Sequence, residues 1–268
     1  MNHAAIGFIG AGNMATAIIS GILRTKQYDP SKIYIFDLDQ KKRTKMAELG
    51  LTVCDSSLKV VKECEYVVLA IKPQNYKEVL EQIRPAVRES LVIVSIAAGI
   101  STDYIKESLQ CNCPVVRAMP NTPLLLGEGA TALCASDNVS KEQFKTACDL
   151  FSASGIVEVL TEDKMNAVIA VNGSSPAYVY LFAKAIVDFA SRYGIDRDQA
   201  TKLCCQTLKG SAQMLSNSGQ TPEELIRMVS SPGGTTLEAL KVLEQKGFYH
   251  AIQDAMAQCT KRAQELAK

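Results

Sequence analysis

The first hundred residues contain five short, unbroken runs of apolar residues, separated by segments of helical character. The runs lie at residues 4–9, 33–36, 51–53, 66–71 and 91–98. Because each run is continuous and not alternating, both faces of the strand that it forms should be buried. Strands that alternate with helices of this length form βαβ units around a parallel sheet. The sequence therefore predicts an α/β fold with a Rossmann-type parallel-sheet domain, whose first strand starts at Ala4.

The rest of the chain divides into two parts with different patterns. Shorter apolar runs at 114–118, 129–134 and 156–160 are expected to extend the sheet. Beyond residue 161 only helical periodicity remains, with helices expected over 176–193, over 198–216 and from 247 onward. We therefore expect a Rossmann domain at 1–161, followed by an all-α dimerisation domain at 162–268. Because these helices are apolar over broad faces, a homo-oligomer is predicted.

The charge balance excludes several classes of function. The chain carries 29 basic and 28 acidic residues, a net charge of +1. It therefore lacks the basic excess that binding to nucleic acid or to an anionic membrane surface requires. The longest apolar stretch, 169–189, is interrupted by polar residues, so no membrane span is expected. Since the first strand starts at Ala4, no cleavable leader is expected either, and we place the protein in the cytoplasm.

The spacing of cysteines and histidines disfavours a metal site. The nine cysteines include no CxxC pair, and the two histidines, His3 and His250, lie near opposite ends of the chain. Zinc ligands usually come in pairs that are separated by about two to four residues. We therefore expect no metal, and buried or half-buried free thiols in a reducing compartment. With so few histidines, any catalysis has to proceed largely without imidazole.

A glycine-rich turn between the first strand and the first helix has the GxGxxA pattern of dinucleotide-binding sites. It comprises Gly10, Ala11, Gly12, Asn13, Met14 and Ala15. Gly10 permits the tight turn, Gly12 lets a pyrophosphate approach the backbone, and Ala15 allows the helix to pack closely on the strand. The motif stands in a chain of βαβ units, which is the context that it requires. We expect its first five residues to bind a nicotinamide dinucleotide.

The end of the second strand affects the choice between the two nicotinamide dinucleotides. Asp37 lies there, where a carboxylate can accept a hydrogen bond from a ribose hydroxyl and favour NADH. Lys41, Lys42 and Arg43 follow, and they could hold the 2′-phosphate of NADPH or simply form a solvated basic face. These residues slightly favour NADH and leave NADPH open.

Further cofactor contacts are expected at the carboxyl ends of later strands, where ligands lie in open parallel sheets. The candidates are Ala70, Ile71, Lys72, Pro73, Ala97 and Ala98, together with Ser57 in the helix after the third strand. Pro73 could instead only mark a turn. The position of these residues in the sheet, more than their chemistry, makes them candidates.

A second glycine-rich segment, Ser230 to Thr236, lies in the helical part of the chain. It has the composition of a helix cap, and Pro232 suits the start of a helix. The pair Gly233 and Gly234 exposes backbone N–H groups, and such a helix start can hold a carboxylate. The residues alone leave a simple cap and a carboxylate site as equal alternatives.

Five segments, taken together, resemble the pyrroline-5-carboxylate reductase family. They are GFIGAGNMA at 7–15, AIKPQ at 70–74, RAMPNTP at 117–123, NGSSPAYVY at 172–180 and SSPGGTTLEAL at 230–240. They occur in the family's order over nearly the whole chain, and the last is the most specific. The resemblance implies that 1-pyrroline-5-carboxylate, a cyclic imine carboxylate, is reduced to L-proline by hydride transfer from NADPH or NADH. This reaction is the last step of proline biosynthesis.

The resemblance also implies roles for individual residues. The N–H groups near Gly234, Thr235 and Thr236 would hold the substrate carboxylate, and the Thr236 side chain would hydrogen-bond the ring nitrogen as a catalytic aid. The implied substrate-binding set is Ser231, Gly233, Gly234, Thr235, Thr236, Ser174 and Ser175. The cofactor-binding set would gain Met119 and Asn121, with Pro120 between them, which line the nicotinamide, and Glu162 near the reaction centre.

Two positions depart from the family pattern. The family commonly has SGSGPAY where this chain has NGSSPAY, which affects Asn172 and Ser175. Its second strand more often ends in a small polar residue than in an aspartate such as Asp37. The individual roles of these residues and the cofactor preference therefore do not follow from the resemblance.

The implied chemistry fits a chain with few histidines. A protonated imine is already electrophilic, so the protein mainly has to orient two flat rings and hold one carboxylate. Family members build the site where the helical domain of one subunit meets the Rossmann domain of another. The resemblance therefore implies at least a dimer, and it allows a decamer.

Two other functions are compatible with the same plan of domains. A β-hydroxyacid dehydrogenase would need a lysine on an inner helix, and Lys164 and Lys184 flank that region. Neither stands in the expected Gly-x-x-x-Asn-x-x-Lys setting. A non-catalytic NAD(P)-binding regulator is the other alternative, and the intact SPGGTT loop disfavours it.

Overall fold

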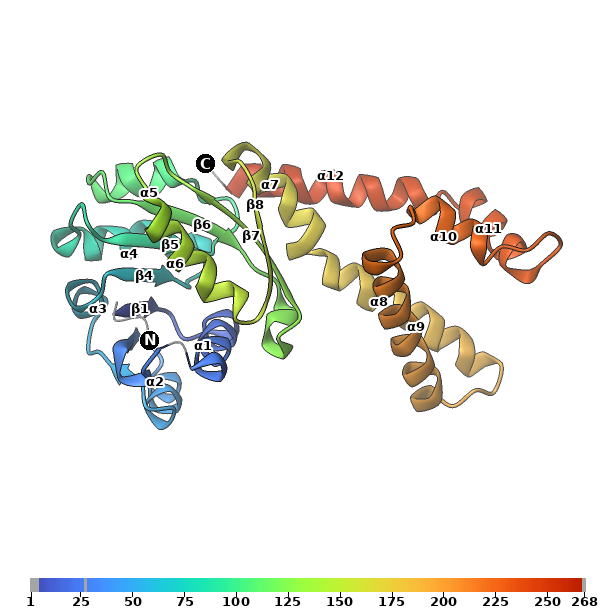
Figure 1. Ribbon diagram of the computed structural model, residues 1–268, viewed down its shortest axis with the longest axis horizontal. Helices are drawn as coiled ribbons and strands as arrows, with labels where there is room; N and C mark the ends of the chain where they lie inside the picture. Colours follow the sequence, from blue (N-terminus) through green and yellow to red (C-terminus); the bar gives the residue numbers. More distant parts are fainter. Residues whose placement is uncertain (1–4, 27, 267–268) are drawn as a thin grey trace. The chain divides into compact units, whose positions relative to one another are not determined.

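The computed structural model describes residues 5–26 and 28–266, which form two compact units (Figure 1). Within the described residues, the first unit comprises the chain up to Ser174 and again from Gln258, and the second comprises residues 175–257. Ala4, the predicted start of the first strand, and His3 lie outside the described residues. The predicted division after residue 161 stays a prediction, and the first compact unit continues past it to Ser174.

Eight strands form one sheet in the first unit, in the order β3-β2-β1-β4-β5-β6-β7-β8 (Figure 1). They are β1 (Ile6–Ile9), β2 (Ile33–Phe36), β3 (Thr52–Val53), β4 (Tyr66–Leu69), β5 (Val92–Ser95), β6 (Val115–Met119), β7 (Gly129–Ala135) and β8 (Gly155–Val159). The first six are parallel, with Phe8 of β1 opposite Ile35 on one side and Val68 on the other. Their order is that of the Rossmann fold, so the predicted fold class is confirmed.

The last two strands depart from a purely parallel sheet. β7 runs antiparallel to β6, with Met119 opposite Ala132, and β8 runs parallel to β7. Only residues 120–128 join β6 to β7. A parallel connection needs about a dozen residues or more, so this short link can only produce an antiparallel pair.

Helices cover both faces of the sheet. The helices of the first unit are α1 (Asn13–Thr25), α2 (Gln40–Glu48), α3 (Ser57–Glu63), α4 (Tyr76–Ile83), α5 (Thr102–Leu109), α6 (Lys141–Ser152) and α7 (Met165–Val168). Short 3-10 segments are η1 (Pro30–Lys32), η2 (Pro73–Asn75), η3 (Arg84–Ala86), η4 (Thr122–Leu126) and η5 (Glu162–Lys164), and η6 (Ile169–Gly173) is a π-helical turn. Phe8 packs into the core beneath α1 and α6, whereas Ile9 packs into the core beneath α3, α4 and α5. The alternation of neighbouring residues between two cores explains why the strands read as continuous apolar runs.

Three helices of this unit, α5, α6 and the short α7, are absent from the sequence predictions. Both α5 and α6 have an apolar face, with Ile105 and Leu109 in α5 and Leu150 and Phe151 in α6, so apolar periodicity also indicates them. Their N-caps are Ser101 and Ser140, and Gln143 completes a capping box with Ser140. A search for capping signals ahead of the apolar pattern would have found them.

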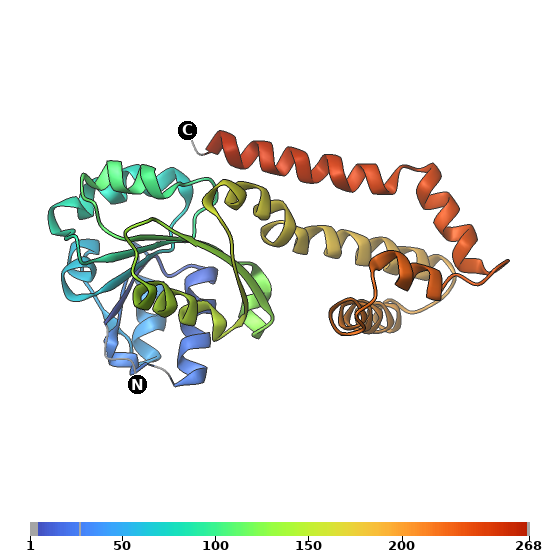
Figure 2. The same ribbon diagram turned by 45° about the horizontal axis from the view of Figure 1, so that its top comes forward.

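The second unit is entirely helical, as predicted (Figure 2). Its helices are α8 (Ser175–Arg192), α9 (Arg197–Asn217), α10 (Pro222–Met228), α11 (Thr235–Gln245) and α12 (Phe248–Leu266), whose last residues belong to the first unit. The buried apolar cluster within this unit consists of only Val187, Ala190 and Ala200. Large side chains such as Leu181 and Phe189 are 68% and 54% exposed. These helices thus leave broad apolar faces uncovered within one chain.

The cysteines and the helix lengths complete the description. All nine cysteines are free, and eight are buried or half-buried as predicted. Cys205 is exposed on α9, so the prediction is wrong for that residue. Burial raises the pKa of the Cys113 and Cys134 thiols to about 12, which leaves them protonated and poorly reactive.

Within the described ranges, no helix has the length and apolar character that crossing a membrane requires.

Candidate active site

The turn after β1 is shaped for the close approach of an anion. Gly10 has a φ of 102°, and a Cβ there would lie 2.4 Å from the Ala70 carbonyl oxygen, so the backbone itself requires glycine. Gly12 is the N-cap of α1, and a Cβ there would meet nothing within 4 Å. The first turn of α1 contains no acidic residue, so its N–H groups and the helix dipole favour an anion. Gly12 therefore keeps space open that the protein does not fill, which fits a dinucleotide pyrophosphate.

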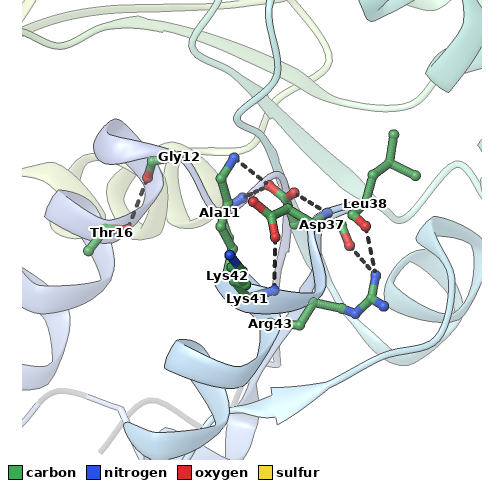
Figure 3. Close-up of polar contacts among 9 residues, drawn as sticks. Ala11, Gly12, Thr16, Asp37, Leu38, Lys41, Lys42 and Arg43 are labelled. Atoms are coloured by element: carbon green, nitrogen blue, oxygen red, sulfur yellow. Dashed lines mark hydrogen bonds and ion pairs between the residues drawn. The ribbon is translucent and has the colours of Figure 1, made fainter.

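The residues after Gly12 complete this helix start. Asn13 and Met14 are the first two residues of α1, and Asn13 is exposed. Ala15 is fully buried, which allows α1 to lie close to the sheet, as its place in the motif predicts. The Thr16 hydroxyl donates to the Gly12 carbonyl at 3.0 Å and steadies the turn (Figure 3).

Asp37, directly after β2, lies against the glycine turn (Figure 3). Its Oδ2 accepts from the Ala11 N–H at 2.7 Å, and its Oδ1 accepts from the Asp39 N–H at 2.8 Å. The Lys42 Nζ lies 3.5 Å from Oδ2, and the Asp37 side chain is only 13% exposed. Two backbone N–H groups and one ammonium thus hold a carboxylate in place beside the proposed pyrophosphate position.

Arg43 has a different position from the lysines that precede it. Its Nη1 donates to the Asp37 carbonyl oxygen at 2.5 Å (Figure 3). Its Nη2 donates to the Gln40 side chain. Its guanidinium lies 5.8 Å from the centre of the Phe36 ring. Lys41, Lys42 and Arg43 therefore do not act as one group. Arg43 hydrogen-bonds the backbone and a side chain at the corner between β2 and α2, whereas Lys42 pairs with Asp37.

The carboxyl ends of four parallel strands meet at one edge of the sheet. Because β1, β4, β5 and β6 are neighbours, this edge brings together Gly10, Ala70, Ala97 and Met119. The chain order reverses between β1 and β4, and ligands of open parallel sheets bind at such a point. The remaining candidates of this edge follow the same strands, namely Ile71, Lys72 and Pro73 after β4 and Ala98 after β5. Pro73 also begins η2, so it does mark a turn.

Ser57 follows the carboxyl end of β3, at the same edge of the parallel sheet as Gly10. It is the first residue of α3, it is buried, and β3 stands two strands away from β1. Its assignment to the cofactor stays a prediction.

Glu162, at the start of η5, lies beside a buried arginine. Its carboxylate accepts from the Thr102 N–H at 2.8 Å and from the Thr102 hydroxyl at 2.5 Å, and it lies 3.7 Å from the Arg117 Nη1. Arg117 is 3% exposed and also donates to the Asn166 Oδ1 at 2.6 Å. Burial lowers the pKa of Arg117, and the Glu162 carboxylate counteracts that effect. The network joins β6, α5 and η5 beside a cavity of about 560 Å³.

The segment after β6 is held by side-chain amides. The Asn121 Oδ1 accepts from the Ala130 N–H at 2.9 Å, and its Nδ2 donates to the Asn172 carbonyl oxygen at 3.2 Å. Ser174 follows the π-helical turn, and its Oγ lies 3.3 Å from the Cys259 Sγ. Ser175 begins α8 and with it the second unit. Met119, Asn121 and Ser174 therefore belong to the first unit, and Ser175 does not.

The glycine pair of the second unit lies in a turn that precedes α11. The Gly234 N–H donates to the Ser231 carbonyl oxygen at 3.0 Å, and Gly233 has a φ of 71°. Proline followed by a glycine with positive φ is the pattern of a type II turn. The helix itself starts at Thr235, so the expectation that Pro232 begins a helix is wrong.

This turn also decides which N–H groups are available to a ligand. Gly234 is the N-cap of α11 and supplies no side-chain cap. Its own N–H is already bonded to Ser231. The N–H groups of Thr235 and Thr236 lie in the first helical turn, where no intrahelical acceptor exists. Two adjacent donors at a helix N-terminus match the two oxygens of a carboxylate.

Comparison with known proteins identifies the family over the whole length of the chain. The sequence profile described as "Pyrroline-5-carboxylate reductase dimerisation" matches residues 162–266. The chain is 37% identical to the pyrroline-5-carboxylate reductase of Escherichia coli (strain K12) over 264 residues, which are 98% of each chain. It is 40% identical to that of Pseudomonas aeruginosa over 270 residues, which cover 100% of this chain and 98% of the other. This chain belongs to the pyrroline-5-carboxylate reductase family.

Solved structures agree with this assignment. The pyrroline carboxylate reductase of Plasmodium falciparum, solved with NADP bound, covers 100% of both chains with a TM-score of 0.93 and 29% identity. The reductase of Coxiella burnetii covers 100% of both chains with a TM-score of 0.90 and 34% identity. The profile "NADP oxidoreductase coenzyme F420-dependent" matches residues 5–99, the part that carries the glycine turn.

The reductase converts 1-pyrroline-5-carboxylate to L-proline with NAD(P)H, in proline biosynthesis. The predicted family, reaction and cofactor class are confirmed, and the two alternatives, a β-hydroxyacid dehydrogenase and a non-catalytic regulator, are wrong. The match of 162–266 to a dimerisation domain also makes the reductase a homo-oligomer.

Two residues of the first unit gain roles that the sequence did not suggest. Arg117 stands in the quoted segment RAMPNTP, and the structure shows it buried and paired with Glu162. An arginine within an otherwise apolar strand was the available signal, because a buried charge needs a partner. Asn172 makes side-chain bonds to two other segments, which sequence spacing cannot reveal.

Proposed function

We propose that the reductase binds the dinucleotide along the glycine turn and the strand ends at Ala70, Ala97 and Met119, and the substrate carboxylate at the start of α11. The observation that carries the second half is the Gly234 cap, which has no side chain to occupy the N–H groups of Thr235 and Thr236. The open space at Gly12 supports the first half. We further propose that the functional domains are 1–161 and 162–268.

The reaction needs orientation more than strong acid–base groups. The bound nicotinamide supplies a hydride to C5 of the imine, and the C=N electron pair moves to the nitrogen, which keeps its proton. The half-buried Thr236 is the second residue of α11, where its hydroxyl can bond the ring nitrogen while its N–H holds the carboxylate. A hydroxyl is a weak acid at neutral pH, so Thr236 positions the nitrogen and helps to retain its proton. Ser174 and Ser175 are proposed to complete the substrate contacts.

We propose that NADH is the preferred cofactor. The Asp37 carboxylate cannot move aside without giving up hydrogen bonds from the Ala11 and Asp39 N–H groups. A 2′-phosphate would therefore meet a fixed negative charge, whereas a ribose 2′-hydroxyl could donate to it. Lys42 reduces the repulsion only in part, because it is already paired with Asp37.

The setting of the enzyme is also a proposal. The assembly is at least a dimer, and the family allows a decamer. The net charge of +1 gives no support for a nucleic-acid partner. Nine free cysteines support a reducing compartment, the cytoplasm.

Substitution of Thr236 tests the proposed catalytic role. Thr236→Ala removes the hydroxyl, and we expect kcat to fall about tenfold to 100-fold while the Kd for NADH stays unchanged. Thr236→Ser retains the hydroxyl and should retain most of the activity. Steady-state oxidation of NADH with 1-pyrroline-5-carboxylate measures kcat, and fluorescence titration measures the Kd. Full activity of Thr236→Ala would refute the role.

A further inference from the structure

Asn172 lies in a π-helical turn that links the Rossmann sheet to the first long helix. The turn, η6, covers Ile169–Gly173, and the Ser174 N–H donates to the Ile169 carbonyl oxygen at 2.8 Å. Such turns are rare and occur frequently at functional sites. The wide turn shifts the residues that follow relative to a regular α-helix, and Asn172 stands within it.

The Asn172 side chain donates two hydrogen bonds to backbone carbonyls. Its Nδ2 lies 2.8 Å from the Met119 oxygen and 2.8 Å from the Ala130 oxygen. Since both partners are acceptors, only an NH₂ group can satisfy them, which fixes the orientation of the amide. The Asn172 Oδ1 is buried and has no hydrogen-bond partner among the described residues. A buried acceptor without a partner lowers the stability of the folded state. The favourable contribution of the Asn172 side chain therefore comes from the two hydrogen bonds that its Nδ2 donates.

The Asn121 side-chain amide also connects the turn η6 to the start of β7. The Asn121 Nδ2 donates to the Asn172 carbonyl oxygen at 3.2 Å, and its Oδ1 accepts from the Ala130 N–H at 2.9 Å. A Cβ on Gly173 would lie 2.9 Å from the Met119 Cε, so the Met119 side chain packs against the same turn. The end of β6, the start of β7 and the turn η6 are thus tied together around Met119.

We propose that Asn172 is a positioning residue, which fixes the segment from Met119 to Asn121 so that the nicotinamide ring is held at hydride-transfer distance from the imine. The inference rests on the proposed function, in which Met119 and Asn121 line the nicotinamide. The family pattern SGSGPAY places serine at this position. A serine hydroxyl donates one hydrogen bond and cannot satisfy both carbonyls. A chain with serine at this position therefore lacks one of the two hydrogen bonds that Asn172 donates.

The test measures hydride transfer on the bound complex. In single-turnover experiments with saturating NADH and 1-pyrroline-5-carboxylate, Asn172→Ser should lower the rate constant about tenfold, since small displacements of reacting groups cost this much or more. The Kd for NADH should change less than about threefold, because the Gly12 and Asp37 contacts are untouched. Asn172→Asp should be slower still, because it places a carboxylate against two carbonyl oxygens. A single-turnover rate constant does not depend on how much of the protein is folded, so lost stability alone would not change it.

Two further variants separate the possible outcomes. Asn138 also ties a loop through its amide, which donates to the Asn112 carbonyl oxygen at 2.8 Å, and Asn138→Ser should leave the rate unchanged. Asn121→Ala tests the proposed nicotinamide site itself. If Asn121→Ala slows hydride transfer and Asn172→Ser does not, the role of Asn172 is refuted and the proposed site stands. If neither variant slows it, the nicotinamide lies elsewhere and both proposals fail.

Discussion

Gly12 and Asp37 show how single residues set the chemistry of the proposed cofactor site. Gly12 leaves room for a ligand, and Asp37 places a fixed negative charge next to it. We predict that Asp37→Asn raises the ratio of kcat/KM for NADPH to kcat/KM for NADH about tenfold, because it removes the charge that opposes a 2′-phosphate. Initial rates with each cofactor give the ratio directly.

Asp39→Asn is the matched control for this substitution. Asp39 caps α2 by accepting a hydrogen bond from the Lys41 N–H. Its replacement by asparagine also removes one negative charge from the corner between β2 and α2. An equal change of the ratio in both variants would mean that overall charge, and not the position of Asp37, controls the preference. An unchanged ratio in Asp37→Asn would contradict the proposed preference for NADH.

The helix α8 presents large apolar side chains that remain exposed within one chain. Its side chains Tyr180, Leu181 and Phe189 are more than half exposed within one chain, although they are large and apolar. Exposed apolar faces of this kind are covered at subunit interfaces. We predict that Leu181→Asp weakens the dimer at least about tenfold, because it buries a carboxylate in an apolar interface. Light scattering during size-exclusion chromatography at decreasing protein concentration measures the change.

Lys184→Ala serves as the control on the same helix. Lys184 forms an exposed ion pair with Asp188 one turn later, and such pairs contribute little to stability. This variant should retain the wild-type mass. If Leu181→Asp also does so, the exposed face of α8 is not the interface.

The whole molecule divides its proposed binding groups between two units. The residues attributed to the cofactor lie mainly in the first unit, and the N–H groups attributed to the substrate carboxylate lie in the second. If one site draws on two subunits, two inactive variants should complement each other. One variant is Gly12→Asp, because a Cβ at Gly12 meets no protein atom within 4 Å while the added carboxylate would repel a bound anion. The other is Thr236→Ala. We predict that the two variants regain activity when they are mixed after reversible dissociation.

The expected recovery follows from random pairing. Half of the mixed dimers are hybrids, and each hybrid contains one site in which both halves are intact, so about a quarter of wild-type activity should return. Mixing without dissociation provides the control. If no activity returns after hybrids have been demonstrated by mass spectrometry, each site is built within one chain.

Local patterns in the sequence were sufficient for much of this protein. Apolar runs predicted all eight strands, because burial on both faces leaves few polar positions in the central strands of the sheet. The signals for the glycine turn and for the start of α1, whose first turn contains no acidic residue, were also local, because the φ angle and the charge at a helix end depend on neighbouring residues. Helices α5 and α6 were not among the predicted helices, although each has an apolar face and a serine N-cap, which are local signals of the same kind.

Only the tertiary structure decided which distant groups meet. The bond from the Ala11 N–H to Asp37, the pairing of Arg117 with Glu162, and the two carbonyls held by Asn172 each join segments far apart in the chain. Such contacts depend on strand order and on how side chains pack across neighbouring elements, which sequence spacing does not encode. Composition and periodicity thus determined the fold class and indicated the proposed cofactor turn, while packing determined which distant side chains surround that turn.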